Sequence, residues 1–104
     1  EPEAVQKALN QWQQQELYVC QEMTTGAYAA HPASSFIKNA RIRYSIGTLA
    51  GDGPYRVGLK IQNGWVYTQG LTHWNQGEED QLVLAGHDEE GRLVVNLQLS
   101  KEPF

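Results

Sequence analysis

Residues 55–74, YRVGLKIQNGWVYTQGLTHW, contain two runs of alternating apolar and polar residues on either side of Asn63 and Gly64. An Asn-Gly pair between such runs is the strongest short-range signal for a β-hairpin, because both residues tolerate the positive φ angles of a type I′ turn. A two-residue turn at this pair would place Leu59 opposite Thr68. The stretch therefore predicts a hairpin whose position and register are set by its turn.

This pairing sorts the side chains of the hairpin onto two faces, because facing residues share a side of the sheet. The first face is mainly apolar and carries Tyr55, Val57, Leu59, Ile61, Val66, Thr68 and Trp74. The second face is basic and aromatic and carries Arg56, Lys60, Gln62, Trp65, Tyr67, Gln69, Leu71 and His73. We expect the first face to lie in the core and the second to face solvent.

The segment before this hairpin alternates in the same way. From position 39 onward, one side of the predicted strand carries Ile42, Tyr44, Ile46 and Thr48. The turn 51–54, GDGP, then leads into the hairpin, so that Ile46 would meet Leu59 and the two apolar sides would agree.

A second hairpin is predicted at the end of the chain. Segments 81–87 and 92–99 alternate on either side of the turn 88–91, DEEG, and would pair Leu84 with Val95. Together these segments predict five strands in hairpin succession, forming an antiparallel meander over residues 39–100 with its apolar side chains on one face.

The N-terminal part predicts a helix over residues 3 to about 23. One apolar stripe at helical spacing contains Val5, Ala8, Leu9, Trp12, Val19, Cys20 and Met23. Glu16 interrupts this stripe, so the segment ELYVC could instead be a short strand after a helix ending near Gln15. Residues 24–38 lack periodicity and predict a connection, with Tyr28 and Phe36 held against the edge of the core.

The resulting fold class is α+β: one domain, 1–104, in which the N-terminal helix packs on a five-stranded meander as a two-layer sandwich. The single cysteine excludes an intrachain disulfide, and no apolar run is long enough to cross a membrane. The order of elements is similar to that of cystatin-like and nuclear-transport-factor-like cone folds, whose curved sheets can enclose a pocket. It is also similar to that of pilin-type subunits, although their C-terminal cysteine pair is absent here.

The outward face of the predicted sheet carries five of the eight Lys and Arg residues and no acidic residue, although the net charge of the chain is −4. An antiparallel sheet normally shows polar residues to water, so this face could be ordinary surface. Trp, Tyr and Arg are also the residue types that anchor protein interfaces. The candidate binding residues are Arg41, Arg43, Arg56, Lys60, Trp65, Tyr67, Leu71, His73 and Arg92.

These observations favour a non-catalytic domain that binds a protein partner or itself, through the basic and aromatic face or through an edge strand. A small-ligand or enzymatic domain with a pocket between helix and sheet is the alternative, and a pilin-type assembly subunit is a lesser one. Binding to nucleic acid is not expected, because the chain is acidic and has no RNA-binding motif. The segment is not expected to insert into a membrane.

No residue pattern predicts catalysis, a cofactor or a metal site. The three histidines, His31, His73 and His87, lack the spacing of a zinc motif, although His73 and His87 would approach each other if the neighbouring strands pair. Cys20 is expected to be a small buried apolar residue, and a buried Glu16 would be a candidate acid or base. The first residues, Glu-Pro-Glu, favour a processed, periplasmic or extracellular protein, with a cytoplasmic one as the alternative.

Overall fold

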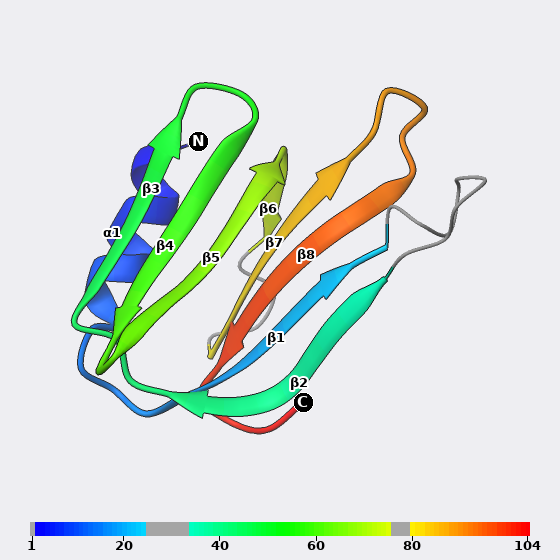
Figure 1. Ribbon diagram of the computed structural model, residues 1–104. Coiled ribbons are helices and arrows are strands. Elements are labelled where there is room, and N and C mark those ends of the chain that lie inside the picture. Colours follow the sequence, from blue (N-terminus) through cyan, green and yellow to red (C-terminus); the bar gives the residue numbers. More distant parts are fainter. Residues whose placement is uncertain (1, 25–33, 76–79) are drawn as a thin grey trace.

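The computed structural model describes residues 2–24, 34–75 and 80–104, which form one helix and two antiparallel sheets (Figure 1). The elements are α1 (Pro2–Gln11), β1 (Leu17–Met23), β2 (Ser35–Ile42), β3 (Ile46–Gly51), β4 (Tyr55–Ile61), β5 (Gly64–Leu71), β6 (His73–Asn75), β7 (Gln81–His87) and β8 (Leu93–Ser100). The α+β class and the N-terminal helix are confirmed. The single meander is wrong, because the strands divide into a five-stranded sheet, β2-β1-β8-β7-β6, and a three-stranded sheet, β3-β4-β5.

Helix α1 ends at Gln11, so the predicted helix over residues 3 to 23 is wrong in its second half. Gln14 adopts a φ of 63°, which no continuing helix allows, and the chain enters β1 at Leu17. Strand β1 pairs with β2 on one side and with β8 on the other. Its central place in the sheet satisfies both sets of backbone hydrogen bonds, and this long-range pairing with β8 outweighs the local helical spacing.

The predicted connection over residues 24–38 is also partly wrong, because β2 already begins at Ser35. Phe36 does not lie against the core: its exposed fraction is 71%. Tyr28 and His31 lie outside the described residues.

The strand predicted from position 39 is divided at residues 43–45, where the chain crosses from one sheet to the other. In β3, Ile46 pairs with Lys60, and Gly47, not Ile46, lies opposite Leu59. This one-residue difference reverses the faces, so that Ile46 is 47% exposed and Gly47 is buried. The prediction that Ile46 and Thr48 face the core is therefore wrong; both are exposed.

The central hairpin is confirmed, but its register is shifted by two residues. Leu59 faces Val66 rather than Thr68, because Gln62 and Asn63 occupy the turn. The type I′ turn is wrong as well, since neither Asn63 nor Gly64 has a positive φ. A shift of two residues leaves the side chains of residues 56–69 on their predicted faces, because side chains alternate with period two.

The last hairpin is also confirmed with a shifted register. Leu84 pairs with Leu97 instead of Val95, again a shift of two, and both leucines are buried as expected. The turn itself is held by Asp88, whose N–H donates to the Arg92 carbonyl oxygen at 3.0 Å.

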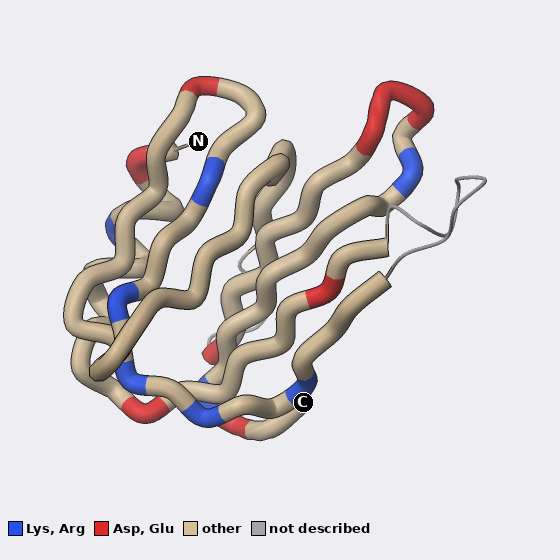
Figure 2. The backbone as a smooth tube through the Cα atoms, in the orientation of Figure 1, with Lys and Arg blue, Asp and Glu red and all other residues tan. Residues whose placement is uncertain are grey.

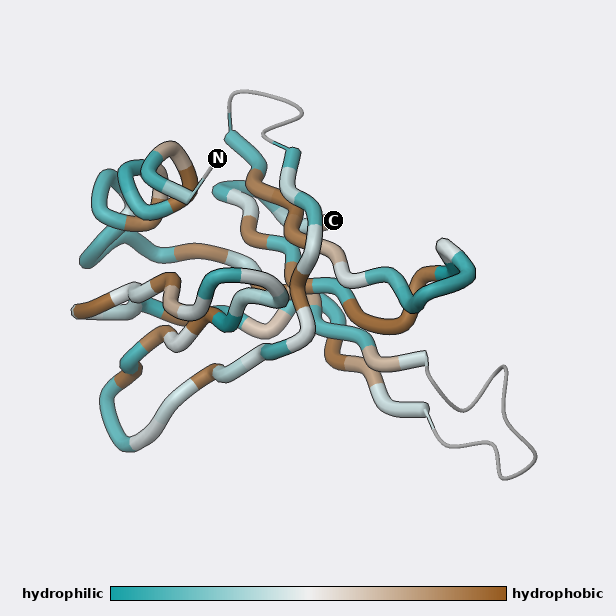
Figure 3. The backbone as a smooth tube through the Cα atoms, turned by 90° about the horizontal axis from the view of Figure 1, so that it is seen from above, coloured by the Kyte–Doolittle hydropathy of each residue, from teal (hydrophilic) through white to brown (hydrophobic). Residues whose placement is uncertain are grey.

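One apolar core joins α1 to both sheets, with Val5, Ala8 and Leu9 from the helix and Trp12 directly after it. Helix α1 packs behind the three-stranded sheet, against β3 (Figure 1). Figure 3 looks down on this arrangement, with α1 to one side of strands that carry short alternating apolar and polar segments. Among the described residues, no helix is long and apolar enough to cross a membrane.

The two sheets come closest where β5 passes β7 and β8. A Cβ atom at Gly86 would overlap the carbonyl oxygen of Gly70, so only glycine allows the two backbones to approach this closely. Gly70 has a φ of 79°, and the pairing of β4 with β5 shifts register beside Arg56. This irregularity turns the next residue, Leu71, into the core.

Candidate protein-binding surface

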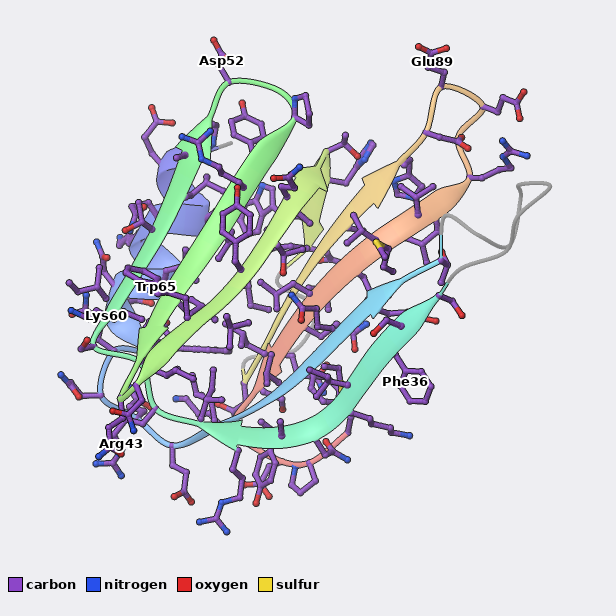
Figure 4. All side chains as sticks on the ribbon, viewed as in Figure 1. Phe36, Arg43, Asp52, Lys60, Trp65 and Glu89 are labelled. Atoms are coloured by element: carbon purple, nitrogen blue, oxygen red, sulfur yellow. The ribbon has the colours of Figure 1, made fainter. Side chains whose placement is uncertain are left out.

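The basic and aromatic face predicted for the central hairpin lies on the outward side of the three-stranded sheet. Trp65 and Tyr67 are 58% and 51% exposed. Trp65 pairs across the strands with Lys60, and its ring lies over Gly58, where an added Cβ would be 3.5 Å away. Arg56 is also exposed on this side. The structure thus gathers four of the predicted residues on one face (Figure 4 labels Lys60 and Trp65).

Two further predicted residues, Arg41 and Arg43, approach this face from the crossover between the sheets. They line a cleft of about 480 Å³ together with Trp65 and the β4–β5 turn. The Arg41 guanidinium lies 3.0 Å from the Glu16 carboxylate, whereas the described residues provide no ion pair for Arg43 or Lys60. Figure 2 shows basic positions along this lower end of the molecule, with acidic positions among them.

The remaining three predicted residues lie elsewhere. Leu71 is 1% exposed, so its assignment to the outward face is wrong. The irregularity at Gly70 turns the Leu71 side chain into the core. His73 lies in β6, beside His87 of β7. Arg92 lies at the turn between β7 and β8, where it contacts acidic residues of its own turn.

The turn that holds Arg92 contains ion pairs between its own residues. The Arg92 side chain lies 2.9 Å from Asp88 and 2.8 Å from Glu90. The backbone N–H of Arg92 donates to the Asp88 carboxylate and lowers the pKa of that group; the guanidinium and the N–H of Glu90 act in the same direction. Arg92 is therefore engaged in shaping its hairpin.

The outer edges of the two sheets are a second candidate surface for protein binding. Most of these edges are protected. The Gln6 side chain of α1 donates to the Gly47 carbonyl at 2.8 Å and accepts the Leu49 N–H at 2.9 Å, so it occupies the outer edge of β3. Gln21 donates to the Tyr67 carbonyl of β5 at 2.8 Å. Strand β6 is only three residues long. Short or covered edges are the usual protection against strand pairing.

Strand β2 is different, because β1 covers one of its edges and no backbone partner is found for the other among the described residues. Its first half is also apolar and exposed: Phe36 is 71% and Ile37 50% accessible. Figure 4 shows Phe36 projecting from β2 away from the other strands. An open edge with exposed apolar side chains is a template for a further strand.

Both faces of this part of β2 are hollowed. Ile37 lines a cleft of about 360 Å³ with Met23 of β1 and Tyr67 of β5. Phe36 lines another, of about 280 Å³, with Cys20 and Phe104. An added strand points alternate side chains to opposite faces, so the two clefts would receive alternate side chains.

At its midpoint β2 is tied to the C-terminal segment. The Asn39 amide donates to the Phe104 carbonyl at 3.0 Å, and its oxygen accepts the Phe104 N–H at 2.7 Å. Asn39 has a φ of 59°, a conformation that asparagine tolerates better than most residues. These contacts limit the open edge to the first part of the strand, which we call the β2 edge and define as Ser35, Phe36, Ile37 and Lys38.

Sequence reasoning missed the β2 edge, because residues 24–38 were interpreted as a connection. One local signal was available: the pair Phe36-Ile37, two strand-favouring residues, follows a Pro- and Ser-containing segment and precedes an alternating strand. That signal indicates a strand beginning before residue 39. It does not indicate that the strand lies at an edge, because neighbours in a sheet are set by long-range pairing.

The other candidate groups take ordinary places. Glu16 is exposed and forms an ion pair with Arg41, so it is not a buried acid. Cys20 is a free thiol, half-buried in the cleft beside Phe36, so its expected burial in the core is wrong. Tyr44 is fully buried and donates to the Leu9 carbonyl at 2.6 Å; burial raises the pKa of its phenol.

The pocket that the alternative function requires is small. A cavity of about 230 Å³ lies among α1 and the strands, lined mainly by apolar residues including Val5, Leu71 and Leu84. Thr72 and His73 are its main polar side chains, and Glu16 does not contribute. Ligand sites usually measure 300–1,000 Å³ and contain several convergent polar groups. This cavity is therefore smaller than most ligand sites and contains few polar groups that could orient a ligand.

The described residues thus form a small α+β domain with one helix, two antiparallel sheets and an open edge on β2. The chain matches, over residues 1–104, the family described as "Protein of unknown function (DUF1806)", and it belongs to this family. It is 41% identical over 108 residues to "Uncharacterized protein YojF" of Bacillus subtilis (strain 168), with 98% of this chain and 93% of the relative covered.

A solved structure agrees with the fold. The crystal structure of the Bacillus subtilis YojF protein is similar to this chain with a TM-score of 0.88 and 39% sequence identity, covering 100% of this chain and 93% of that one. Similarity at this level supports the sheet arrangement described above.

Proposed function

We propose that this chain is a protein-binding domain that accepts an extended segment of a partner along the β2 edge. The observation that carries the proposal is the difference among the sheet edges: those of β3 and β5 are occupied by glutamine side chains, whereas the β2 edge has no backbone partner among the described residues and exposes Phe36 and Ile37. Main-chain hydrogen bonds would give affinity to the added strand, and the clefts on either face would select its side chains.

The charged side chains at the β2 edge are of both signs. Lys38 lies within the edge, whereas Glu22 of β1 pairs opposite Phe36 and lines the clefts on both faces. Complementary charge mainly raises the rate of association and excludes wrong partners, while the apolar contacts provide most of the affinity. Salt is therefore expected to weaken binding without abolishing it.

The test compares Ile37→Glu and Phe36→Glu with Ile46→Glu. All three positions are exposed strand residues, but Ile46 lies on β3, whose edge Gln6 occupies, so it is a matched control. Each variant is used as bait for capture from the native host with quantitative mass spectrometry, and its self-association is measured by sedimentation. We expect the two β2 variants to lose the partner, or the dimer, that wild type and Ile46→Glu retain. Equal binding by all four proteins would refute the proposal.

A second candidate is binding through the basic and aromatic face, which is favoured by the 58% exposure of Trp65. The double variant Trp65→Ala, Arg56→Ala removes the anchors of this face and leaves the β2 edge intact. If the double variant loses the partner while Ile37→Glu retains it, the face rather than the edge is the binding surface. Far-UV circular dichroism of each variant checks that the fold is preserved.

A further inference from the structure

Two histidines meet at the junction of β5, β6 and β7. His73 lies opposite Ala85 in the β6–β7 pairing, and the ring of His87 approaches it from the end of β7. The Nδ1 atoms of the two rings are 3.1 Å apart. Their centroids are 4.8 Å apart, and the planes are nearly perpendicular, at 89°. Both rings thus direct the same nitrogen toward a common point.

Thr72 fixes this geometry from between the strands. Its N–H donates to the Ala85 carbonyl at 2.8 Å, and its hydroxyl accepts the backbone N–H of His87 at 3.1 Å. The same hydroxyl oxygen lies 2.7 Å from Nδ1 of His73. The backbones on both sides of the histidine pair are therefore held by one residue, so the rings approach each other on fixed strands.

Three polar atoms converge on this point, the two Nδ1 atoms and the Thr72 hydroxyl oxygen. Nδ1 of a neutral imidazole carries either one hydrogen or one in-plane lone pair. Nδ1 of His73 faces both the Thr72 hydroxyl and Nδ1 of His87, so its single donor or acceptor position serves one good contact at a time. A cation between the rings would instead use the lone pairs of both nitrogens.

The separation of the two nitrogens matches a metal chelate. Imidazole nitrogens bind zinc at about 2.0–2.1 Å. Two bonds of that length to atoms 3.1 Å apart enclose an angle of about 100°, which lies between the square-planar and tetrahedral values. Imidazole ligands favour zinc, copper and nickel over magnesium or calcium.

We propose that His73 and His87 form a two-imidazole site for a divalent late transition-metal ion, with the Thr72 hydroxyl beside it. Among the described residues, no group of three or more His, Cys, Asp or Glu side chains is placed to hold a metal. The ion therefore keeps coordination positions for water or for a donor from another molecule, and its affinity is below that of structural four-ligand sites. This inference does not depend on the proposed protein-binding function.

The test uses the full chain and the metals alone, ZnCl2 and NiCl2, in isothermal titration calorimetry. We expect one ion per chain with either metal, and at least a tenfold loss of affinity in His73→Gln and in His87→Gln. His31→Gln and Cys20→Ser are the matched controls, because they remove the third histidine and the only thiol of the chain. Both are expected to bind as wild type does.

A second measurement needs no variant. The chain has three histidines, and their ring proton signals are resolved by NMR during a zinc titration of the wild-type protein. We expect two of the three sets of signals to shift together and to saturate at one equivalent. Absence of one-to-one binding, or binding that the His73 and His87 substitutions leave unchanged, would overturn the proposal. A loss in His31→Gln as large as that in His73→Gln would also overturn it.

Discussion

The outer edges of β3 and β2 both carry unpaired backbone groups, but they differ in what covers those groups. Each strand pairs on one side only, so each presents unpaired backbone groups on the other. On β3 the side chain of Gln6 acts as a substitute strand, with both amide atoms bonded to the backbone. On β2 the described residues provide nothing of this kind along Ser35–Lys38, where Phe36 and Ile37 are apolar and exposed. Within the described ranges, one edge is therefore protected and the other is not.

The largest effect is expected from removing the protection of β3. In Gln6→Ala, the Gly47 carbonyl and the Leu49 N–H lose their partner in a partly buried place, which costs about 1–3 kcal/mol of unfolding free energy. The new open edge should also cause concentration-dependent association. Urea denaturation and sedimentation measure the two effects. Lys7→Ala, on an exposed neighbouring position of α1, should leave both unchanged.

Tyr44 connects this protected edge to the rest of the core, because its hydroxyl bonds the Leu9 carbonyl in the last turn of α1. Tyr44→Phe leaves that carbonyl without its buried partner, and we expect a loss of about 1–2 kcal/mol in urea denaturation. Tyr67→Phe removes an exposed hydroxyl instead and should change stability by less than about 0.5 kcal/mol. Equal effects of the two substitutions would contradict the role given to the buried bond.

The raised pKa of Tyr44 adds a pH dependence with a definite sign. The folded-state pKa lies above the ordinary value of 10.0, so its contribution to stability is complete below pH 10 and is lost as the pH rises further, when only the unfolded state releases the proton. The unfolding free energy of wild type should fall more steeply above pH 10 than that of Tyr44→Phe. Parallel curves for the two proteins would rule out this origin.

A smaller effect is expected at the edge of β5. Gln21 donates to the Tyr67 carbonyl and to the Thr68 hydroxyl, so Gln21→Ala should cost about 0.5–1.5 kcal/mol. Gln98→Ala is the control, because the described residues provide no hydrogen-bond partner for that side chain. If Gln21→Ala is as neutral as the control, then the covering of β5 is not a stabilising feature.

The smallest effect on stability is expected on the open edge itself. Phe36→Ser removes a side chain that is 71% exposed, so the unfolding free energy should change by less than about 0.5 kcal/mol. The same substitution should weaken association with a partner. A loss of stability above about 1 kcal/mol would mean that Phe36 is packed in solution, and the contrast between the two edges would then disappear.

The positions of both hairpins were predictable, but their registers were not. In each hairpin the observed pairing is shifted by two residues, which brings Leu59 to Val66 and Leu84 to Leu97. Alternation fixes which face a side chain occupies, and every even shift satisfies it equally well. Packing with residues outside the hairpin then selects one register, and only the structure contains that information.

The candidate surface was predictable to a similar degree. Trp65 and Lys60 lie on the face that alternation assigned to them, whereas Leu71 does not, because an irregularity at Gly70 reverses the alternation there. The prediction that His73 and His87 come near each other is confirmed at 3.1 Å. The open β2 edge could not be derived, because an edge exists only once the order of all strands is known.

The local properties follow from the order of the amino acids: the amphipathic start of α1, the two hairpins and the division of each into an apolar and a polar face. Those properties depend on residues within a few positions of one another. The tertiary structure alone decided that residues 17–23 form a strand between β2 and β8, that the strands divide into two sheets, and which edges remain open. Backbone pairing and core packing decide these features, because they join residues that are far apart in the chain and cannot be read from any local pattern.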